Sequence, residues 1–189
     1  MRAVFAHDYE TDFKMMEPLL DLENHPLVFV HWDTHMGNIV VLNKPVEKQS
    51  KTMIMDFEIS GYNFRGRDLG NFLMSRSGFY PFPRNDNRLE TFEEFKPFLE
   101  AYLKEWHKTH EKSERFDNLD HLMLESMIGC LTSCLLYFLR FLFLFAKKKG
   151  EGKVCENLRR HTLNMFQGYT ECLAAMKNRY PDPLKVLRG

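Results

Sequence analysis

Residues 27–42 read LVFVHWDTHMGNIVVL, and residues 52–71 read TMIMDFEISGYNFRGRDLGN. Within them, two short apolar runs, 39–42 and 52–55, lie on either side of a polar loop at 43–51. Such a pattern predicts a β-hairpin. The polar residues Asp33 and Asn38 precede the first run, and Asp56 follows the second. The predicted hairpin therefore brings both polar clusters to one end of the same small sheet.

The two clusters have the order found in protein kinases, H-x-D-x-x-x-x-N and then D-F. In this geometry Asp33 meets a substrate hydroxyl group, and Asn38 turns back towards a metal ion that Asp56 faces from the other side. The spacing predicts a site for phosphoryl transfer from Mg-ATP. A purely structural alternative makes Asp33 a turn residue, Asn38 a cap and Asp56 an Asx-turn at the strand end. His31 is counted with Asp33 as a catalytic-loop residue, and hydrogen bonding of the loop is favoured over proton transfer as its role.

Residues 56–71 resemble the second signature of the choline/ethanolamine kinase family, in which D-F-E precedes Y-N-x-R-G-x-D-[IL]-G-N. The matching residues are Tyr62, Asn63, Arg65, Gly66, Asp68, Gly70 and Asn71. The first motif is similar to the family's H-N-D-x-x-x-G-N-I, with Trp32 in place of the usual Asn. The resemblance implies a two-lobed, protein-kinase-like fold. It also implies transfer of a phosphoryl group from ATP to choline or ethanolamine, towards phosphatidylcholine or phosphatidylethanolamine.

The resemblance implies roles for individual residues. Asp33 would accept or orient the proton of the substrate hydroxyl group. Asn38 and Asp56 would hold Mg²⁺ against the ATP phosphates, and Glu58 would reach metal-bound water. The residues expected to stabilise the loop rather than touch substrate are Asn63, Arg65 and Asp68.

The substrate pocket departs from the family's pattern. The family places a W-x-x-W pair on its long core helix, where a cation lies over ring faces. Here Tyr137 stands where one Trp would fall, and Arg140 stands near the other. Tyr80, Tyr137 and Phe138 are the candidate residues for a partial aromatic cage. Arg140 would repel a quaternary ammonium group, so we expect choline to lose more affinity than ethanolamine.

Only residues 1–26 precede the strand predicted at 27–30, and they carry no Gly-rich phosphate loop. We therefore expect an α+β fold over residues 1–189 that corresponds to the mainly helical C-terminal catalytic lobe, with the N-terminal ATP-binding lobe absent. One hypothesis is an amino-alcohol kinase. The second is a catalytically idle regulatory partner that pairs with a copy of itself or with a family member. A sugar or aminoglycoside kinase is a third option, although such kinases share the loop around Asp33 but not the motif at 62–71.

Composition restricts the other classes of function. The chain has 189 residues, 44% of them hydrophobic, with 17 Phe, so a packed core is expected. With 26 basic and 26 acidic residues, its formal net charge is zero, which gives no argument for nucleic acid or an anionic membrane. Four cysteines without a C-x-x-C pair favour a reduced, cytoplasmic setting. The N-terminus has no apolar segment long enough for a signal peptide.

The rest of the chain has helical patterns. We expect helices over 8–22, from 68 to 74, along the aromatic stripe 92–106, over 119–148 and around 158–176, the last one stopped by Pro181 and Pro183. The apolar run 127–146 is long enough to span a membrane. Arg140 lies near its centre, and Gly129, Thr132 and Ser133 dilute its first half. A buried core helix is therefore favoured over stable membrane insertion.

Overall fold

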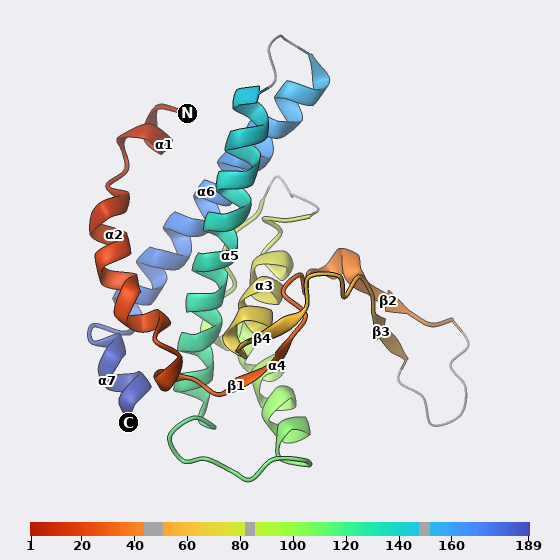
Figure 1. The fold of residues 1–189 in the computed structure, drawn as a ribbon, viewed down its shortest axis with the longest axis vertical. Coiled ribbons are helices and arrows are strands. Elements are labelled where there is room, and N and C mark those ends of the chain that lie inside the picture. The colour runs from red at the N-terminus through yellow and green to blue at the C-terminus, as the bar shows by residue number, and fades with distance from the viewer. Residues whose placement is uncertain (44–50, 82–85, 148–151) are drawn as a thin grey trace.

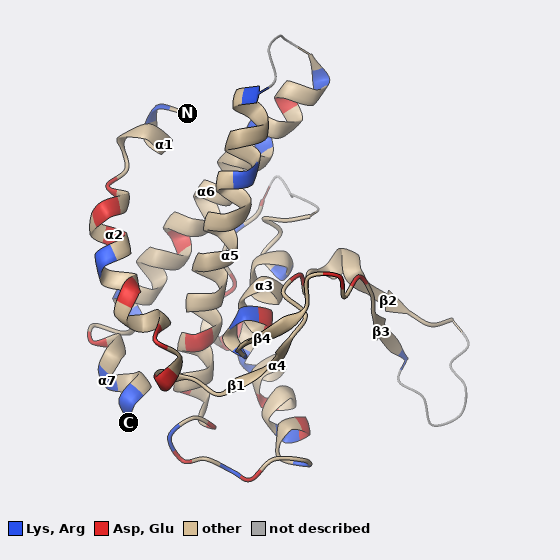
Figure 2. Cartoon of the chain, in the orientation of Figure 1, with Lys and Arg blue, Asp and Glu red and all other residues tan. Residues whose placement is uncertain are grey.

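The computed structural model describes residues 1–43, 51–81, 86–147 and 152–189 (Figure 1). Within these ranges the chain is mainly helical, with two small antiparallel sheets, which confirms the expected α+β class. The α-helices are α1 (Arg2–Ala6), α2 (Tyr9–Met16), α3 (Gly66–Arg76), α4 (Phe92–Trp106), α5 (Leu119–Lys147), α6 (Lys153–Arg179) and α7 (Pro183–Arg188). Helix α2 carries two acidic residues, Glu10 and Asp12, and one basic residue, Lys14 (Figure 2).

Three of the four strands in the described residues lie where the sequence predicts them, and the fourth, at Gly61–Phe64, was not predicted. Strand β1 (Leu27–Val30) pairs with β4 (Gly61–Phe64), with Val30 opposite Gly61. Strand β2 (Ile39–Val41) pairs with β3 (Thr52–Ile54), with Ile39 opposite Ile54. The expected hairpin over 39–42 and 52–55 is thus confirmed, while most of its polar loop, 44–50, lies outside the described residues. A 3₁₀ turn, η3 (Met36–Asn38), connects the loop after β1 to β2.

Helices α3 and α5 touch through their backbones. A Cβ atom on Gly70 would lie 2.1 Å from the backbone nitrogen of Cys130, and one on Gly129 would lie 1.8 Å from the carbonyl oxygen of Gly66. No side chain fits at these distances, so the two glycines permit the close approach. The contact fixes the first turns of α3, which contain the end of the second sequence motif, against the buried half of α5.

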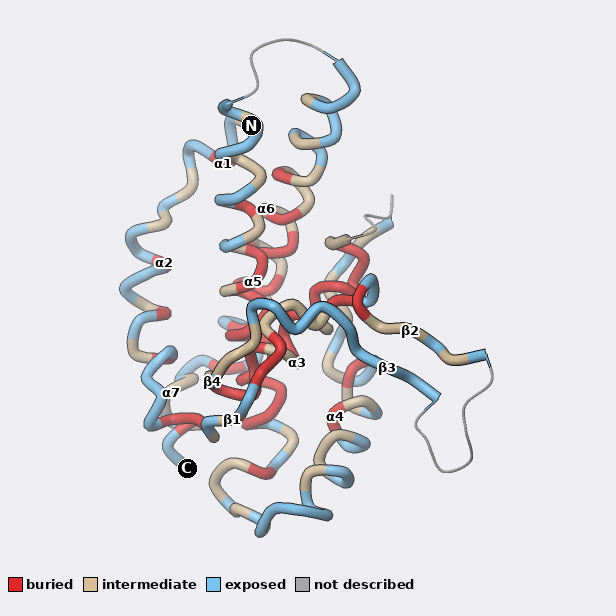
Figure 3. Tube along the Cα trace, turned by 45° about the vertical axis from the view of Figure 1, so that its right-hand side comes forward, coloured by how far each residue is buried: buried red, intermediate tan, exposed pale blue. Residues whose placement is uncertain are grey.

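Helix α5 is buried along its N-terminal half and more exposed towards its C-terminus (Figure 3). Leu124, Ile128 and Leu131 are fully buried, while Leu139 and Phe143 are exposed. By length and composition α5 could cross a membrane, a test that the core helix of a soluble protein also passes. Its packing against α3 and α6 fits the expected core helix.

The N-terminal and C-terminal helices differ in detail from the prediction. The helix expected over 8–22 divides into α2 and two 3₁₀ turns, η1 (Glu17–Leu20) and η2 (Leu22–Asn24), with Pro18 at the start of η1. Helix α6 begins at Lys153, earlier than expected, and ends before Pro181, as expected. Helix α7 was not predicted: Pro183 occupies its first turn, where a proline is tolerated, and Asp182 caps it.

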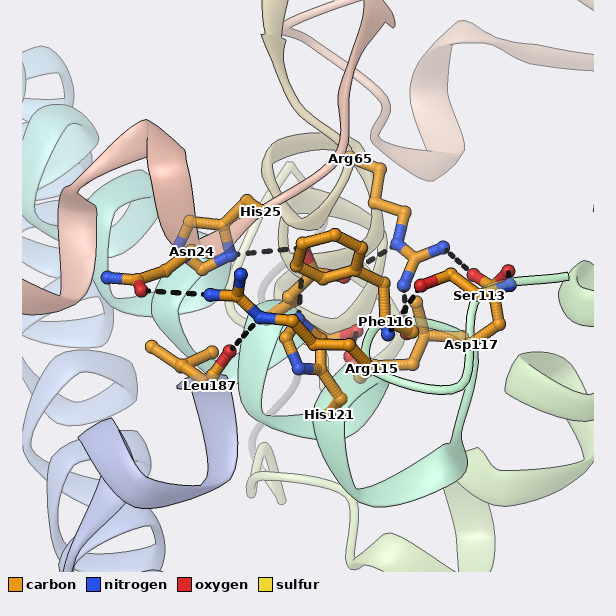
Figure 4. A network of polar contacts seen from close by, with 12 residues as sticks. Asn24, His25, Arg65, Ser113, Arg115, Phe116, Asp117, His121 and Leu187 are labelled. Carbon is orange, nitrogen blue, oxygen red and sulfur yellow. Dashed lines mark hydrogen bonds and ion pairs between the residues drawn. The ribbon is translucent and has the colours of Figure 1, made fainter. Parts of the chain in front are cut away.

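A buried ionic network joins the segments around the N-terminus of α5 (Figure 4). Arg65, 1% exposed, donates from Nε to Glu125 Oε2 at 2.6 Å and from Nη1 to Asp117 Oδ1 at 2.7 Å. His25 Nδ1 lies 3.0 Å from Glu125 Oε1, and Arg115 Nε donates to the carbonyl of Leu187 at 3.1 Å. Arg65 thereby connects the end of β4 to α5 and to the loop before it.

Candidate active site

The loop after β1 is held by one carboxylate, that of Asp68 in the first turn of α3. Asp68 Oδ2 accepts the backbone N–H of His31 at 2.8 Å, and Oδ1 accepts that of Trp32 at 3.0 Å. The hydroxyl group of Thr34 also donates to Oδ1, at 2.5 Å. The three hydrogen bonds to this one carboxylate are charge-assisted. Such bonds are shorter and stronger than hydrogen bonds between neutral groups. The geometry is the one expected of a residue that stabilises the loop.

The loop contains a strained residue. Trp32 has φ +71°, in the left-handed region, which a bulky side chain rarely adopts. Such a conformation costs on the order of 1–3 kcal/mol and persists only where neighbouring contacts enforce it. Asn71 Nδ2 donates to the carbonyl of Trp32 at 3.1 Å, and the Asp68 contact holds its N–H. Both sides of the strained residue are therefore fixed by α3.

His31 joins the loop to the second acidic cluster. Its Nδ1 accepts the backbone N–H of Asp33 at 3.2 Å, so Nε2 carries the proton and donates to the carbonyl of Met55 at 2.6 Å. The backbone N–H of Met55 donates in turn to the carbonyl of Asn38 at 2.9 Å. Both ring nitrogens of His31 are thus used in positioning the loop beside the residue that precedes Asp56.

Asp33 is surrounded by hydrogen-bond donors. Asn38 Nδ2 lies 3.3 Å from Asp33 Oδ2 and 3.0 Å from its backbone oxygen, and the Tyr137 hydroxyl group donates to Asp33 Oδ1. His35 Nε2 lies 3.5 Å from the same Oδ1, while His35 Nδ1 accepts the N–H of Gly37 at 3.0 Å. Burial lowers the pKa of His35, which favours a neutral imidazole with its proton on the side of Asp33.

An aromatic group lies next to Asp33. The rings of Tyr80 and Tyr137 stack with centroids 4.4 Å apart, and Phe141 lies 5.8 Å from Tyr80. Burial raises the pKa of the Tyr137 hydroxyl group, and its hydrogen bond to Asp33 raises it further, so it remains a donor. Phe138 does not join this group: it is 3% exposed and packs instead against Tyr9 and Phe166. Of the three candidate cage residues, the structure brings two together.

The candidate metal ligands differ in exposure. Asn38 is buried, whereas Asp56 and Glu58 are exposed, and Asp56 has φ +64°. Within the described part of the chain, no hydrogen bond reaches Asn38 Oδ1 or the carboxylate of Asp56. Carboxylate and amide oxygens are the ligands that Mg²⁺ prefers, so this donor set fits that ion. Asn63 contacts its own neighbour instead of the loop, since its Oδ1 accepts the N–H of Phe64 at 2.9 Å.

Asp33 opens onto a pocket of about 280 Å³. Its lining includes Trp32, Arg67, Tyr137 and Arg140. A larger, apolar pocket of about 820 Å³ lies between α2 and α5 and contains none of the candidate residues, so its size alone does not make it a reaction site. The smaller pocket contains Asp33, the residue expected to meet the substrate hydroxyl group, and we take it as the candidate substrate pocket.

Two residues at this site had no role in the sequence analysis. His35 lies in the variable part of the first motif, and Arg67 occupies the variable position of Y-N-x-R-G-x-D. The guanidinium carbon of Arg67 lies 5.0 Å from the centre of the Trp32 ring. A basic residue inside an otherwise matching motif is the signal that could have drawn attention to Arg67.

Comparison with known proteins decides the family. The family model for choline/ethanolamine kinase matches residues 2–151. This chain belongs to the choline/ethanolamine kinase family. The match includes both motifs around Asp33 and Asp56 and extends along the whole of α5, so the family assignment rests on most of the chain rather than on the motifs alone.

Members of the family from several organisms are similar in sequence to part of this chain. The choline/ethanolamine kinase of Homo sapiens is 45% identical over 71 residues, which is 38% of this chain and 18% of that protein. The probable ethanolamine kinase A of Dictyostelium discoideum is 32% identical over 118 residues, 60% of this chain and 30% of the relative. Choline kinase alpha of Mus musculus is 28% identical over 135 residues, 66% of this chain and 30% of the relative. The matching segment therefore spans less than a third of each relative's length.

Proposed function

We propose that this chain is the catalytic lobe of a protein-kinase-like enzyme that transfers a phosphoryl group from ATP to the hydroxyl group of a small amino alcohol, choline or ethanolamine. The observation that carries the proposal is the double link between the two motifs, His31 Nε2 to the carbonyl of Met55 and the N–H of Met55 to the carbonyl of Asn38. These bonds place the end of β3, and with it Asp56, next to the loop that bears Asp33.

Each polar side chain has a defined task in this proposal. Asp33 accepts a hydrogen bond from the substrate hydroxyl group and takes its proton as the new P–O bond forms. The bond between the γ-phosphorus of ATP and its bridging oxygen breaks, and ADP leaves. Asn38 and Asp56 would hold Mg²⁺ through their side-chain oxygens. When bound, the ion neutralises charge on the transferring phosphate. Asp68 keeps the loop in place, and no covalent intermediate with the protein is needed, because positioning and charge supply most of the catalysis in this reaction class.

The surface near Asp56 suits a second lobe. Phe57 is 54% exposed, Ile59 54%, Phe29 59% and Tyr62 75%. Exposed apolar side chains grouped on one small sheet and the segment beside it mark a surface that another body covers. We propose that an ATP-binding lobe covers it in the active enzyme, and that the enzyme acts in the cytoplasm.

One contact favours a second candidate function, a catalytically idle partner protein. The Tyr137 hydroxyl group already donates to Asp33 Oδ1, and Asn38 already donates to Oδ2, so both carboxylate oxygens are engaged. A substrate hydroxyl group must displace Tyr137 or share its acceptor. If the chain is idle, Tyr137→Phe leaves it inactive. If it is a kinase whose alcohol substrate competes with Tyr137 for Asp33, the same change lowers the KM for the alcohol.

The kinase proposal is tested by activity. The N-terminal part of the human relative is fused to this chain, and ADP release is measured with ATP, Mg²⁺ and either choline or ethanolamine. We expect turnover that falls by a factor of about 10²–10⁴ in Asp33→Asn, the contribution typical of a positioned acid or base. Asp21→Asn, a change at an exposed acid that caps η2, is the matched control. Turnover that Asp33→Asn leaves unchanged contradicts the proposal.

The metal site is tested on the chain itself. Mn²⁺ broadens the resonances of residues near its site, and we expect broadening around η3 and the end of β3. Asp56→Ala should abolish it, whereas Glu111→Ala, at an exposed acid outside the site, should not. Equal broadening in wild type and Asp56→Ala rules out the assignment of Asp56 as a ligand.

A further inference from the structure

Two histidines and one glutamate meet in the buried network at the N-terminal end of α5 (Figure 4). His25 precedes β1, whereas His121 and Glu125 lie four positions apart in the first two turns of α5. All three residues are buried, and one possible ligand atom from each lies within 4.8 Å of the others. Atoms that share one Zn²⁺ ion at about 2.0–2.2 Å lie about 3–4 Å apart, so the three groups are close to the spacing of a metal site.

The two ring nitrogens of His25 have different neighbours. Nε2 lies 2.7 Å from the carbonyl oxygen of Leu19, which can only accept, so Nε2 carries a proton and donates it. Nδ1 then faces Glu125 Oε1 at 3.0 Å, and two acceptors at that distance repel each other unless a cation lies with them. This cation is either a second proton on His25 or a metal ion. Metal-binding histidines usually donate their other N–H to a carbonyl or carboxylate group, as His25 does.

His121 favours the metal ion over the proton. It is 0% exposed, and neither of its ring nitrogens makes a hydrogen bond within the part of the chain that the structure describes. Its Nε2 lies 3.8 Å from Glu125 Oε1, too far for a hydrogen bond. Burial lowers the pKa of His121, which keeps the ring in the neutral form that binds metals. A second proton on His25 would leave His121 without a partner, whereas a shared metal ion satisfies both rings.

Glu125 keeps one carboxylate oxygen on the side of the histidines. Its Oε2 accepts from Arg65 Nε at 2.6 Å, and its Oε1 faces His25 and His121. Arg65 also pairs with Asp117, so one guanidinium group serves two carboxylates. With its histidines neutral, the network therefore carries one excess negative charge. A cation beside Oε1 offsets this charge in a place where water does not screen it.

We propose that His25 Nδ1, His121 Nε2 and Glu125 Oε1 bind a divalent transition-metal ion, Zn²⁺ by preference, that stabilises the fold. Two imidazoles and one carboxylate suit Zn²⁺, whereas Mg²⁺ prefers oxygen ligands alone. The site is separate from the proposed Mg²⁺ site at Asn38 and Asp56, and it does not depend on the proposed function.

The ion would be enclosed, because the ligand atoms face one another in the interior. It therefore binds while the segments assemble, as in proteins whose metal binding is coupled to folding. His121 and Glu125, about one helical turn apart, offer two ligands before the segment with His25 docks against them. The backbone of Val186 borders the His121 ring without a hydrogen bond to it and is a candidate for the fourth ligand, which water otherwise supplies.

The test loads the metal during folding and measures no activity. The chain is refolded from urea under reducing conditions in EDTA, in equimolar Zn²⁺ or in equimolar Co²⁺, and unbound metal is removed by gel filtration. We expect about one Zn²⁺ per chain by elemental analysis and a higher urea midpoint than in EDTA, because the ion binds the folded chain. Co²⁺ should give visible absorption bands without a thiolate charge-transfer band, which distinguishes this site from binding by the four cysteines.

Two ligand variants and one control assign the site. His121→Leu places an apolar side chain at a fully buried position, so it should fold in EDTA and gain no stability from Zn²⁺. His25→Gln should lower the Zn²⁺ affinity at least as much as loss of a group that orients a ligand, about 10–100-fold. His110→Gln, at an exposed histidine outside the network, is the control and should retain both the ion and the gain in midpoint.

Three outcomes overturn the proposal. A refolded chain without bound Zn²⁺, or with the same midpoint in Zn²⁺ and in EDTA, leaves a proton on His25 as the cation of this network. A thiolate band with Co²⁺ assigns the metal to cysteines instead. Binding that His121→Leu retains in full excludes His121 as a ligand. None of these measurements involves ADP release, so the metal site and the kinase proposal can fail independently.

Discussion

Asp68 Oδ1 accepts the backbone N–H of Trp32 at 3.0 Å, across 36 positions of sequence. The bond runs from the first turn of α3 to a residue with φ +71°, so a helix end stabilises a conformation that the loop would not adopt alone. Because Asp33 is the next residue, the direction of its side chain depends on this bond. We propose that Asp68 acts on the candidate reaction through the backbone of the loop rather than by contact with substrate.

Asp68→Asn tests this dependence. The amide keeps one oxygen acceptor but loses the negative charge and turns an N–H₂ group towards donors, so the loop should loosen. We expect the free energy of unfolding to fall by about 1–3 kcal/mol, the range for loss of a buried hydrogen-bond partner. Urea unfolding measures it, and the indole N–H of Trp32 reports the loop. Glu111→Gln, at an exposed site, should have no effect. Identical midpoints for wild type and Asp68→Asn would show that the loop is held by other contacts.

Gly70→Ala should destabilise the fold strongly. Its Cβ would lie 2.1 Å from the backbone nitrogen of Cys130, and backbone atoms cannot rotate away as a side chain can. We expect a loss of about 3 kcal/mol or more, the upper range for overpacked sites. Gly61→Ala is the matched control, because nothing lies within 4 Å of a Cβ at that position. Thermal and urea unfolding compare the two; equal stability would mean that α3 and α5 can separate at little cost.

Stability should fall in mildly acidic solution because of His121. Burial lowers the pKa of His121 from its ordinary value of 6.5, so the folded chain keeps this imidazole neutral. As the pH falls below about 6.5, the unfolded chain takes up a proton at His121 that the folded chain does not, and folding stability decreases. Above that pH the two states have the same charge there and the contribution is constant.

The effect is isolated by His121→Leu, which removes the titrating group from a site that is 0% exposed. Unfolding midpoints in urea are measured at half-unit steps from pH 5 to 8. The wild type should lose more stability than the variant between pH 6.5 and pH 5. Parallel curves for the two proteins over this range would mean that His121 does not control the acid response.

The four cysteines should differ sharply in reactivity. Cys130, Cys134 and Cys172 are buried, whereas Cys155 is partly exposed at the start of α6. Burial raises the pKa of the Cys172 thiol, which reduces its thiolate form as well as its accessibility. A thiol reagent should therefore modify one cysteine rapidly in the folded protein, and Cys155→Ser should remove that fast phase. Rapid modification of a second cysteine would contradict the packing of α5 against α6.

The sequence predicted the parts of the fold whose signals are local. Strand β1 begins at Leu27 and ends at Val30 as expected, because an apolar run between Pro26 and a polar loop has few alternatives. Helix α4 matches its expected range from Phe92 to Trp106, where aromatic residues recur at helical spacing and Thr91 provides a capping box. The hairpin of β2 and β3 follows from alternating apolar and turn segments.

Contacts between distant segments had no sequence signal of this kind. The pairing of β1 with β4 across the hairpin and the hydrogen bond from Tyr137 to Asp33 depend on how α3 and α5 pack. The same holds for Phe138. Its neighbour in sequence, Tyr137, faces Asp33. One position along a helix turns a side chain by about 100°, so Phe138 points into the core instead. The roles proposed for the site residues remain predictions that the experiments above address.

The backbone contact at Gly70 and Gly129 also separates the part of α5 that packs against α3 from the part that lines the pocket. The contact holds α3 against α5, and α3 in turn fixes the loop through Asp68 and Asn71. Beyond it, Tyr137 and Arg140 lie on later turns of α5 and line the pocket. Substitution on the later turns of one helix can therefore change the lining of the pocket, while the hydrogen bonds from α3 that hold the loop stay the same.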